Sequence, residues 1–406
     1  MKKRTLIVGG GAAGFFTAIT IAESNPDMQV TILEKTSKIL QKVRVSGGGR
    51  CNVTQACFDP SELAEKYPRG SRELLGPFHR FMTGDTMAWF ESRGVPLKIE
   101  SDGRVFPTSN SSESIIDCLV SSAEQAGVQL ELKQGVKSIE HKESHFEIQT
   151  DQNIFEADYL VMCTGSNLKM WELLSSLGHT IISPVPSLFT FNIKDQLIEE
   201  LPGVSVKNAR VRIKDFNFES SGPVLITHWG LSGPAVLKLS AFAARALAAM
   251  NYQYTVHVNW LSLSHHEVLE RLNEFKNRHS KQQVAVKSAF DEIPKRLWNK
   301  LVSAVVTDRQ TTWAMLSKKQ LNAMTDQLVK TTFHAQGKST FKEEFVTAGG
   351  VDLKEINFKN FESRLHKNLF FTGEVLNIDA VTGGFNFQNA WTGAYLAGNY
   401  IAEQTT

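Results

Sequence analysis

A glycine-rich segment near the start of the chain constrains the fold more than any other feature of the sequence. Residues 5–8 precede it as a short apolar run, which is typical of a buried parallel strand. Gly9, Gly11 and Gly14 follow in the spacing G-x-G-x-x-G. In such a segment the first glycine permits a tight turn, the second lets the backbone approach a pyrophosphate, and the third lets a helix pack against the strand.

The residues after the glycines complete a defined order of elements. Residues 12–24 are predicted to form a helix whose positive N-terminal end faces the phosphates, and residues 29–33 to form a second strand. Glu34 ends that strand, where its carboxylate is placed to accept hydrogen bonds from ribose hydroxyls. This order predicts a dinucleotide-binding βαβ unit. A glycine-rich strand-to-helix turn that binds no ligand is the alternative.

Length and charge narrow the class of protein. A chain of 406 residues exceeds one ordinary hydrophobic core, so two or three domains are expected. The formal net charge is only +2, so we expect neither nucleic acid nor an anionic membrane as partner. No apolar stretch approaches the ~20 residues that span a bilayer, and the basic residues 2–4 precede an apolar run too short for a signal peptide.

The cysteines favour a reducing compartment. Cys51, Cys57, Cys118 and Cys163 show neither the spacing of a metal site nor the pattern of a disulfide-rich secreted domain. We therefore expect a reduced, cytoplasmic protein with no metal site. Cys51 has no partner in a Cys-x-x-Cys motif, so a structural role is favoured over a redox role.

The character of the sequence changes several times along the chain. Residues 1–187 have α/β character, residues 188–262 alternate apolar and polar side chains as strands do, and residues 263–330 are polar and helix-like. A strand at 331–344 is predicted to close the β-rich part, and α/β character returns over 345–406. The sequence thus predicts an α/β domain interrupted by a β-rich domain and a small helical domain.

Several local predictions accompany this division. Residues 35–54, rich in glycine and basic side chains, are expected to form a loop. Ser112 is expected to cap a helix over 113–127, and Ser317 to cap the last helix of the helical part. In that part, helices are predicted at residues 265–278, 283–290, 294–306 and 318–330.

A run of three glycines at 47–49 is the second strong feature. Ordering consecutive glycines costs conformational entropy, which is reasonable where backbone must lie close to a bulky ligand. Lys42, Arg44 and Arg50 flank the run and are suited to offset phosphate charge. The alternative is a flexible surface loop.

The third feature lies near the C-terminus. An apolar run at 369–372 ends in Gly373 and Glu374, which places a carboxylate where a sugar-like chain can be hydrogen-bonded. Gly383 and Gly384 then begin a helix, whose N–H groups and positive end suit an electron-rich carbonyl such as the pyrimidine edge of a reduced flavin. Ordinary helix capping is the alternative.

Taken together, these features resemble a known group of proteins. An N-terminal glycine-rich βαβ unit, a mid-chain Thr164-Gly165 after a strand and a C-terminal Gly-acid strand are shared with the two-dinucleotide-binding flavoproteins. Four longer strings make the chain similar to the HI0933-like flavoprotein family: Ser-Gly-Gly-Gly-Arg-Cys-Asn at 46–52, Thr-His-Trp-Gly-Leu-Ser-Gly-Pro at 227–234, Thr-Ala-Gly-Gly-Val at 347–351, and the segment 373–388. This resemblance implies an α/β, Rossmann-like FAD-binding domain with non-covalent FAD, an inserted β-barrel-like domain and a small helical domain.

The resemblance also implies a role for each matching residue. The first glycines would hold the pyrophosphate, Glu34 the adenosine ribose, and Val136 would sit near the adenine. Residues 46–52 would line the ribityl and flavin region. The residues implied to bind FAD are Gly9, Gly11, Ala12, Ala13, Gly14, Glu34, Lys35, Lys42, Ser46, Gly47, Gly48, Gly49, Arg50, Cys51, Asn52, Val136, Thr164, Gly165, Gly373, Glu374, Asp379, Gly384, Phe385 and Asn386.

The chain departs from the family pattern after Thr164-Gly165. A longer Gly/Ser/Pro-rich loop is expected there, whereas residues 163–170 run directly into a helix-like stretch, so the substrates of the family are not transferred. No catalytic residue is assigned. His228 is the one candidate for proton exchange with the flavin, against the alternative of a structural histidine.

The resemblance implies an FAD-dependent oxidoreductase that transfers a hydride between the flavin and a small organic substrate. The substrate would lie between the isoalloxazine and the inserted domain, with oxygen or NAD(P)H as the other partner. A second G-x-G-x-x-G is absent, so NAD(P)H is expected to bind only transiently. The alternatives are an RNA-modifying or RNA-binding flavoprotein and a non-catalytic FAD-binding sensor. Substrate identity, reaction direction and oligomeric state stay open.

Overall fold

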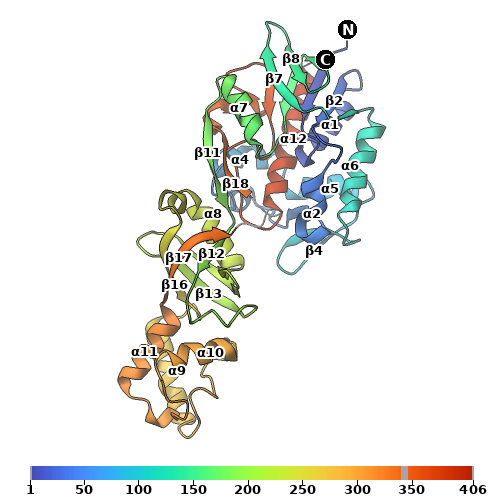
Figure 1. Ribbon diagram of the computed structural model, residues 1–406. Helices are drawn as coiled ribbons and strands as arrows, with labels where there is room; N and C mark the ends of the chain where they lie inside the picture. The colour runs from blue at the N-terminus through green and yellow to red at the C-terminus, as the bar shows by residue number, and fades with distance from the viewer. Residues whose placement is uncertain (1, 340–345, 405–406) are drawn as a thin grey trace. The chain divides into compact units, whose positions relative to one another are not determined.

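The computed structural model describes residues 2–339 and 346–404. The chain forms two compact units (Figure 1). The first contains Met1–Val185 and Val346–Thr406, and the second is the continuous segment Pro186–Phe345. The second unit is therefore an insertion in the chain of the first.

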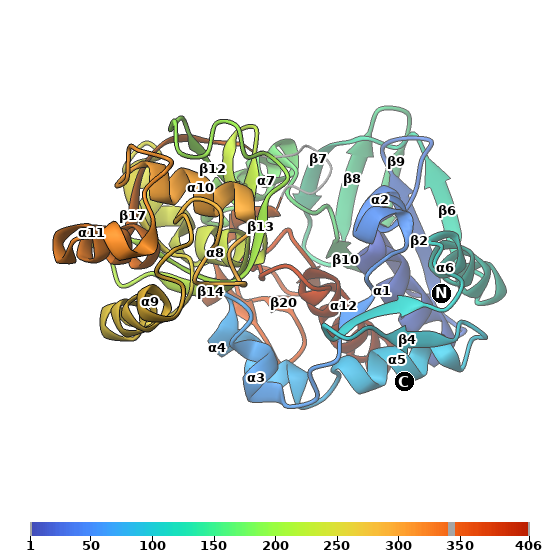
Figure 2. The same ribbon diagram turned by 90° about the horizontal axis from the view of Figure 1, so that it is seen from below.

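A seven-stranded sheet forms the centre of the first unit, in the order β19-β20-β21-β10-β1-β2-β6. Figure 2 labels β20, β10, β2 and β6 of this sheet. The five strands from β21 to β6 are parallel, and β20 and β19 continue the sheet in antiparallel fashion. Strands β1 and β10 are almost fully buried, as expected for parallel strands with both faces covered. The bounds are β1 Arg4–Val8, β2 Gln29–Glu34, β6 Gln129–Leu132, β10 Tyr159–Met162, β19 Ile356–Asn357, β20 Glu362–Ser363 and β21 Leu369–Phe371.

Two helices from opposite ends of the chain pack together in the first unit. Helix α1, Ala12–Ser24, has the predicted bounds, and ten of its 13 residues are buried. It packs against α12, Phe385–Glu403, where Gly398 lets the helices meet closely: a Cβ on it would lie 2.8 Å from the side chain of Thr20. The N- and C-terminal segments of the chain are thus joined in one core.

Smaller elements complete the first unit. The three-stranded sheets are β3-β5-β4 and β7-β8-β9, and β11 pairs with β18. The strand bounds are β3 Thr54–Gln55, β4 Leu97–Ile99, β5 Arg104–Pro107, β7 Val136–His141, β8 Phe146–Thr150, β9 Ile154–Ala157, β11 Ile181–Ser187 and β18 Val346–Val351. The helices are α2 Gln41–Gly49, α3 Pro60–Ala64, α4 Ser71–Phe78, α5 Thr83–Glu91, α6 Glu113–Gln125, α7 Leu168–Ser176 and η2 Leu353–Glu355.

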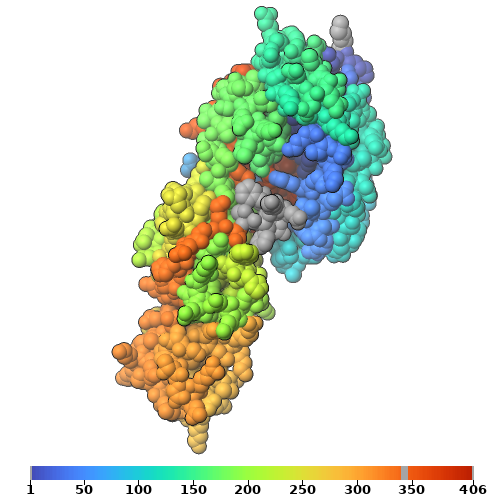
Figure 3. Space-filling view, viewed as in Figure 1, coloured from blue at the N-terminus to red at the C-terminus, as the bar shows by residue number. Residues whose placement is uncertain are grey.

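A closed barrel of six strands organises the second unit, in the order β12-β15-β14-β13-β16-β17. Its segments run from yellow-green to orange in Figure 3. Helix α8, Pro234–Ala249, packs on β12, β13 and β14. Of the strand predicted at 331–344, residues 331–339 form β17, and 340–344 lie outside the described residues, as does residue 345. The strands are β12 Thr190–Ile193, β13 Ser205–Ile213, β14 Glu219–Thr227, β15 Gly230–Ser232, β16 Gln253–Asn259 and β17 Thr331–Ser339.

The helices of the second unit share one hydrophobic core with the barrel. They are α9 His265–Arg278, α10 Lys295–Ser303, η1 Trp313–Met315 and α11 Lys318–Val329. Ser317 caps α11 as predicted, accepting the Gln320 N–H at 3.2 Å. Among the residues described in either unit, no helix is long and apolar enough to cross a membrane.

Two local predictions are wrong, and a third holds only in part. Residues 283–290 form turns, because the indoles of Trp298 and Trp313 bond the carbonyls of Val284 and Lys287 at 2.8 and 3.2 Å and fix a non-helical path. The predicted loop 35–54 contains helix α2.

Ser112 occupies the predicted N-cap position of α6, which begins at Glu113, but its side chain makes no capping hydrogen bond. Its hydroxyl donates instead to the carbonyl of Arg44 in α2, at 2.9 Å, and its N–H donates to the Gly49 carbonyl at 2.8 Å. The residue therefore ties α6 to the glycine-rich segment that ends α2.

Candidate active site

The glycines of the first loop differ in what surrounds them. A Cβ atom on Gly9 would lie 2.5 Å from the carbonyl oxygen of Cys163, and one on Gly14 would overlap the carbonyl oxygen of Gly9. The packing of the protein itself therefore requires both glycines. No atom of the described residues lies within 4 Å of a Cβ placed on Gly11. The backbone at the start of α1 is thus bare at Gly11, as the close approach of a ligand requires.

Glu34 lies beside this loop at the end of β2. Its carboxylate accepts the Gly10 N–H at 3.0 Å through Oε2 and the Thr36 N–H at 2.9 Å through Oε1. A carboxylate offers about four acceptor positions. Glu34 therefore fixes the glycine loop and keeps capacity for further donors such as hydroxyl groups.

Val136 is brought to the same end of β2. Gln134 donates its N–H to the Glu34 carbonyl at 2.9 Å. A Cβ on Gly135 would lie 3.9 Å from the Cβ of Lys35. The start of β7 therefore runs alongside the predicted ribose end of the site.

Helix α2 ends in a bare glycine turn. The backbone leaves the helix at Ser46, and residues 47–49 take positive φ angles of 58°, 69° and 83°, which favour glycine. No atom of the described residues lies within 4 Å of a Cβ on Gly48 or Gly49. The hydrogen bonds from Ser112 hold this turn against α6, so it is an ordered segment whose backbone is open to one side.

The residues after this turn are held by the protein. Arg50 pairs with Glu100 at 2.7 Å and stacks 3.9 Å above the ring of Phe106. Cys51 is fully buried, which raises the pKa of its thiol to about 12 and keeps it protonated and unreactive at neutral pH. Asn52 is also buried, and its side-chain oxygen has no hydrogen-bond partner among the described residues.

Distant parts of the chain meet at the carboxyl ends of the parallel strands. Lys42 on α2 forms an ion pair with Glu374, which follows β21. A Cβ on Gly165, which follows β10, would lie 4.0 Å from the Lys42 ammonium, and one on Gly373 would lie 3.2 Å from the Cβ of Ala13 on α1. Ligands of α/β sheets bind at this edge.

The start of α12 is pinned beside the same loops. A Cβ on Gly384 would lie 2.7 Å from backbone atoms of Thr54 in β3. The Tyr67 hydroxyl donates to the carbonyl of Phe385 at 2.5 Å. The first N–H groups of a helix have no partner within the helix, and its positive end favours negative charge. Residues 384–387 therefore present a fixed, electropositive backbone edge.

Two of the predicted cofactor residues near α12 are engaged by the protein. The carboxylate of Asp379 is fully buried and forms a two-point ion pair with Arg69. The side-chain oxygen of Asn386 accepts the Ala380 N–H at 3.0 Å. Both side chains order the loop between β21 and α12, so any contact they make with a ligand comes in addition to this role.

The buried polar atoms test whether this edge suits a dinucleotide. The side-chain oxygen of Asn52, the hydroxyl of Thr164 and the whole amide of Asn389 are buried without a partner among the described residues. Such groups cost free energy unless something bonds them. Together with the bare glycines and the N-terminal ends of α1 and α12, they form a donor-rich cradle that fits a flavin dinucleotide.

Two residues that hold the loops of the site, Arg69 and Ser112, and the unpartnered amide of Asn389 were not predicted from the sequence. Asn389 and Arg69 carry no motif of their own, although polar residues at the apolar start of α12 were a signal for the first. Ser112 was predicted only as a helix cap, because a serine before a helix often has that role. Its hydrogen bond to the carbonyl of Arg44 was not predicted.

His228, the candidate for proton exchange, belongs to the second unit. It is exposed in the turn between β14 and β15. A pocket of about 540 Å³ includes it, lined by Pro202, Gly203, Leu225, Ile226, Thr227, His228 and Arg296.

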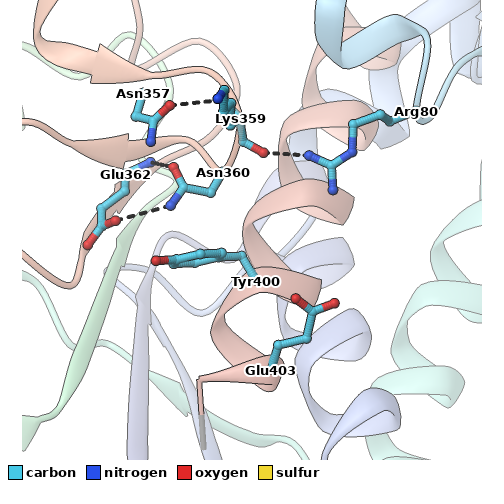
Figure 4. A pocket seen from close by; sticks show the side chains of 7 residues that line it. All are labelled: Arg80, Asn357, Lys359, Asn360, Glu362, Tyr400 and Glu403. Atoms are coloured by element: carbon cyan, nitrogen blue, oxygen red, sulfur yellow. Dashed lines mark hydrogen bonds between the residues drawn. The ribbon is translucent and has the colours of Figure 1, made fainter.

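A second pocket, of about 310 Å³, belongs to the first unit (Figure 4). Its lining mixes both signs of charge, and Arg80 donates to the Lys359 carbonyl at 2.6 Å across it. None of the residues predicted to bind the cofactor is in its lining, which consists of Arg80, Asn357, Lys359, Asn360, Glu362, Tyr400 and Glu403.

Comparison with known proteins assigns this architecture. The sequence profile of the HI0933-like protein Rossmann domain matches residues 3–400. The chain belongs to the HI0933-like family. Within it, the chain is 28% identical over 410 residues to a 3-dehydro-bile acid delta(4,6)-reductase of Clostridium scindens, covering 98% of both chains. It is also 28% identical over 414 residues to a ribosomal RNA dihydrouridine synthase of Haemophilus influenzae, again covering 98% of both.

A solved structure supports the fold of this family member. The 3-ketosteroid-delta4-(5alpha)-dehydrogenase of Rhodococcus jostii aligns over 98% of this chain and 97% of that chain, with a TM-score of 0.50 and 13% identity. The predicted fold class, a Rossmann-type FAD-binding domain with a β-barrel, is confirmed. The HI0933-like chain is an FAD-dependent oxidoreductase.

Proposed function

We propose that the protein transfers a hydride between FAD and a small organic substrate whose carbon–carbon double bond is conjugated with a carbonyl group. One observation carries the cofactor part: five separate segments converge on bare glycines and unpartnered buried polar atoms at one sheet edge. The names of two relatives support the substrate class. A delta(4,6)-reductase of a 3-dehydro compound and a dihydrouridine synthase both saturate a double bond conjugated with a carbonyl.

The roles of the chain's own residues follow from their positions. Gly11 and the start of α1 would admit the pyrophosphate, and Glu34 would accept hydroxyls of the adenosine ribose. Gly48 and Gly49 would border the ribityl and flavin region. FAD, when bound, supplies the two-electron chemistry at its isoalloxazine ring.

Helix α12 would tune that chemistry. Its N-terminal N–H groups, held in place by the contact of Gly384 with Thr54, favour the added negative charge of a reduced flavin. Asn389 and Asn52 would donate and accept hydrogen bonds that the protein leaves unmade. These groups bind and orient, and they require no side-chain nucleophile.

The electron partner and the proton donor are also proposals. For saturation of the double bond, NAD(P)H would supply the hydride to the flavin, and it would bind transiently because a second dinucleotide fingerprint is absent from the sequence. Oxygen would accept the electrons only in the opposite direction, when the substrate is oxidised. His228 is proposed as the acid–base group, and the pH profile of a His228→Asn variant tests it. A lowered rate with an unchanged pH profile would contradict this role.

An anaerobic experiment tests the substrate class. The flavin is reduced with NADPH or dithionite, and its absorbance near 450 nm is followed after adding matched pairs of compounds, such as 2-cyclohexenone and cyclohexanone, or a 3-oxo-4-ene steroid and its saturated counterpart. We expect the conjugated member of a pair to restore the colour and the saturated member to leave it bleached. Equal rates within every pair, or bleaching of the oxidised protein by simple amines, would overturn the proposal.

A second candidate function is reduction of uracil bases in RNA. The ribosomal RNA dihydrouridine synthases of Haemophilus influenzae and Escherichia coli, each 28% identical to the chain, favour it. Incubating the reduced protein with unmodified ribosomal RNA and measuring dihydrouridine by mass spectrometry tests it. A flavoprotein that no donor reduces would instead be a binding protein, the third candidate.

A further inference from the structure

Positive charge is concentrated in the second unit. Residues 186–345 contain 21 Lys and Arg against 14 Asp and Glu, a formal net charge of +7. The whole chain carries +2, so the first unit carries −5. The nearly neutral total conceals this division. A strongly basic part in an otherwise acidic chain indicates a polyanionic partner.

Part of this charge lies on one side of the barrel. Strands β13, β16 and β17 are neighbours, and their side chains alternate between the buried barrel interior and solvent. Register places Arg212 opposite His257, and His257 opposite Thr332. We call the outward side of these strands, with the residues that directly flank them, the basic face. Its cations and histidines include Arg210, Arg212, Lys214, His257, Lys330 and His334.

The cations of the basic face have one carboxylate neighbour on the adjacent strand, Glu219 of β14, which stands opposite Arg212 in the register. Arg210 pairs with Glu219 at 3.4 Å on the surface. Within the described ranges, Arg212, Lys214 and Lys330 have no carboxylate within ion-pair distance. Burial lowers the pKa of His257, and the positive charges of these same three residues lower it further, while Asp215 alone opposes them. The face therefore carries a positive local potential.

The groups between the cations are hydrogen-bonding rather than apolar. Thr332 and Thr255 lie within 3.1 and 3.3 Å of His257 and His334 respectively, and Asn259 stands opposite Arg210. None of the large apolar side chains exposed on the described surface belongs to this face. Cations and hydroxyls without apolar anchors suit phosphates and sugars, whereas a membrane-binding surface also inserts apolar groups.

We propose that the basic face of the barrel binds the sugar–phosphate backbone of RNA. Arg210 and Arg212 on β13 and Lys214 directly after it follow at every second residue, about 6.8 Å apart in extended chain, so they form a line along which an extended nucleic-acid strand can lie. The choice of RNA rests on the second candidate function. The binding itself requires neither reduced flavin nor turnover, so it is measured separately.

Fluorescence anisotropy with the full-length, FAD-loaded protein tests the proposal. The probe is a labelled single-stranded 20-nucleotide RNA, titrated between 50 and 300 mM salt. The test variant is Arg212→Gln/Lys214→Gln/Lys330→Gln. The control, Lys281→Gln/Lys287→Gln/Lys319→Gln, removes the same charge from exposed positions elsewhere in the second unit. Flavin absorbance and thermal melting check that both variants fold.

The plot of log K against log salt has a negative slope, and the loss of three phosphate contacts should make it shallower by about 2. At 0.1 M salt this corresponds to RNA binding that is weaker by on the order of 100-fold. The control should lose less than tenfold. Equal losses in both variants would overturn the proposal, because they would mean that only net charge matters. The proposal would also be overturned if the native protein did not bind RNA at 50 mM salt. Binding to anionic phosphatidylglycerol vesicles in place of RNA would count as this same negative result. Flavin reduction and reoxidation, assayed without RNA, report on the proposed hydride transfer alone.

Discussion

Replacing Gly11 by alanine separates the requirements of the ligand from those of the fold. A Cβ at this position meets no atom of the described residues within 4 Å. Gly11 is the N-cap of α1 with φ −99° and ψ −171°, an extended conformation that alanine adopts without strain. The apoprotein therefore loses only cap preference, about 0.5–1 kcal/mol. It gains about 0.4–1 kcal/mol because the unfolded chain is less flexible.

The expected result is a folded protein that binds FAD poorly. The two terms nearly cancel, so the apoprotein should melt within about 2–4 °C of the native apoprotein. A methyl group pressed against a bound pyrophosphate resembles overpacking, which costs about 1–3 kcal/mol. That range corresponds to about 5- to 150-fold weaker FAD binding. Titration of apoprotein with FAD, followed by flavin fluorescence and thermal melting, measures both quantities.

Gly14→Ala is the matched control. Its Cβ would overlap the carbonyl oxygen of Gly9, so this variant should be destabilised even without FAD, by about 3 kcal/mol or more. If Gly11→Ala binds FAD as tightly as the native protein, or if the two apoproteins melt alike, the division between ligand-required and fold-required glycines is refuted.

Further predictions concern buried groups. Asp379→Asn should destabilise the protein by about 3–5 kcal/mol in denaturant unfolding, because Arg69 loses its partner in a largely buried ion pair, and an unchanged midpoint would contradict this. Burial lowers the pKa of His179 despite its hydrogen bond to Glu355. As the pH falls, the imidazole is therefore protonated in the unfolded chain before it is protonated in the folded protein. The contribution of this residue to stability is then present above about pH 6.5 and lost below it, up to about 1.4 kcal/mol per pH unit, and His179→Gln should flatten that part of the profile. Cys51, with its thiol pKa raised to about 12, should resist iodoacetamide at pH 8 until the protein unfolds, and rapid labelling would show that it is accessible.

Local patterns made the first part of the fold predictable. The spacing of glycines and apolar residues located α1 at residues 12–24 and the strands on either side, because turn chemistry and periodicity act over a few residues. The same kind of signal failed at residues 283–290. There two tryptophans distant in sequence take the backbone carbonyls, and no local pattern records such contacts.

The sequence allowed us to predict which segments form the candidate site, but not how these segments are arranged in space. Motifs marked Lys42 and Glu374, but their ion pair depends on how β21 and α2 meet in space. The motif predicted a separate role for each of its three glycines, but not the atoms around them. The structure shows that Gly11 faces open space, whereas Gly9 and Gly14 touch the protein. The net charge of the whole chain gave a wrong expectation for a similar reason. A total of +2 does not show that the second unit is basic and the first unit is acidic.

The insertion has a consequence for how the protein is made. Synthesis delivers Pro186–Phe345 as one uninterrupted stretch, so this unit has all of its strands and its core before the last part of the first unit leaves the ribosome. The first unit cannot complete its fold until the end of synthesis, because β21 and α12 come from its final segment. Until then α1 lacks its main packing partner, and the edge that receives FAD lacks one side. Cofactor loading is therefore a step that follows translation, and a chain truncated before α12 should display a complete barrel on an unfinished nucleotide-binding unit.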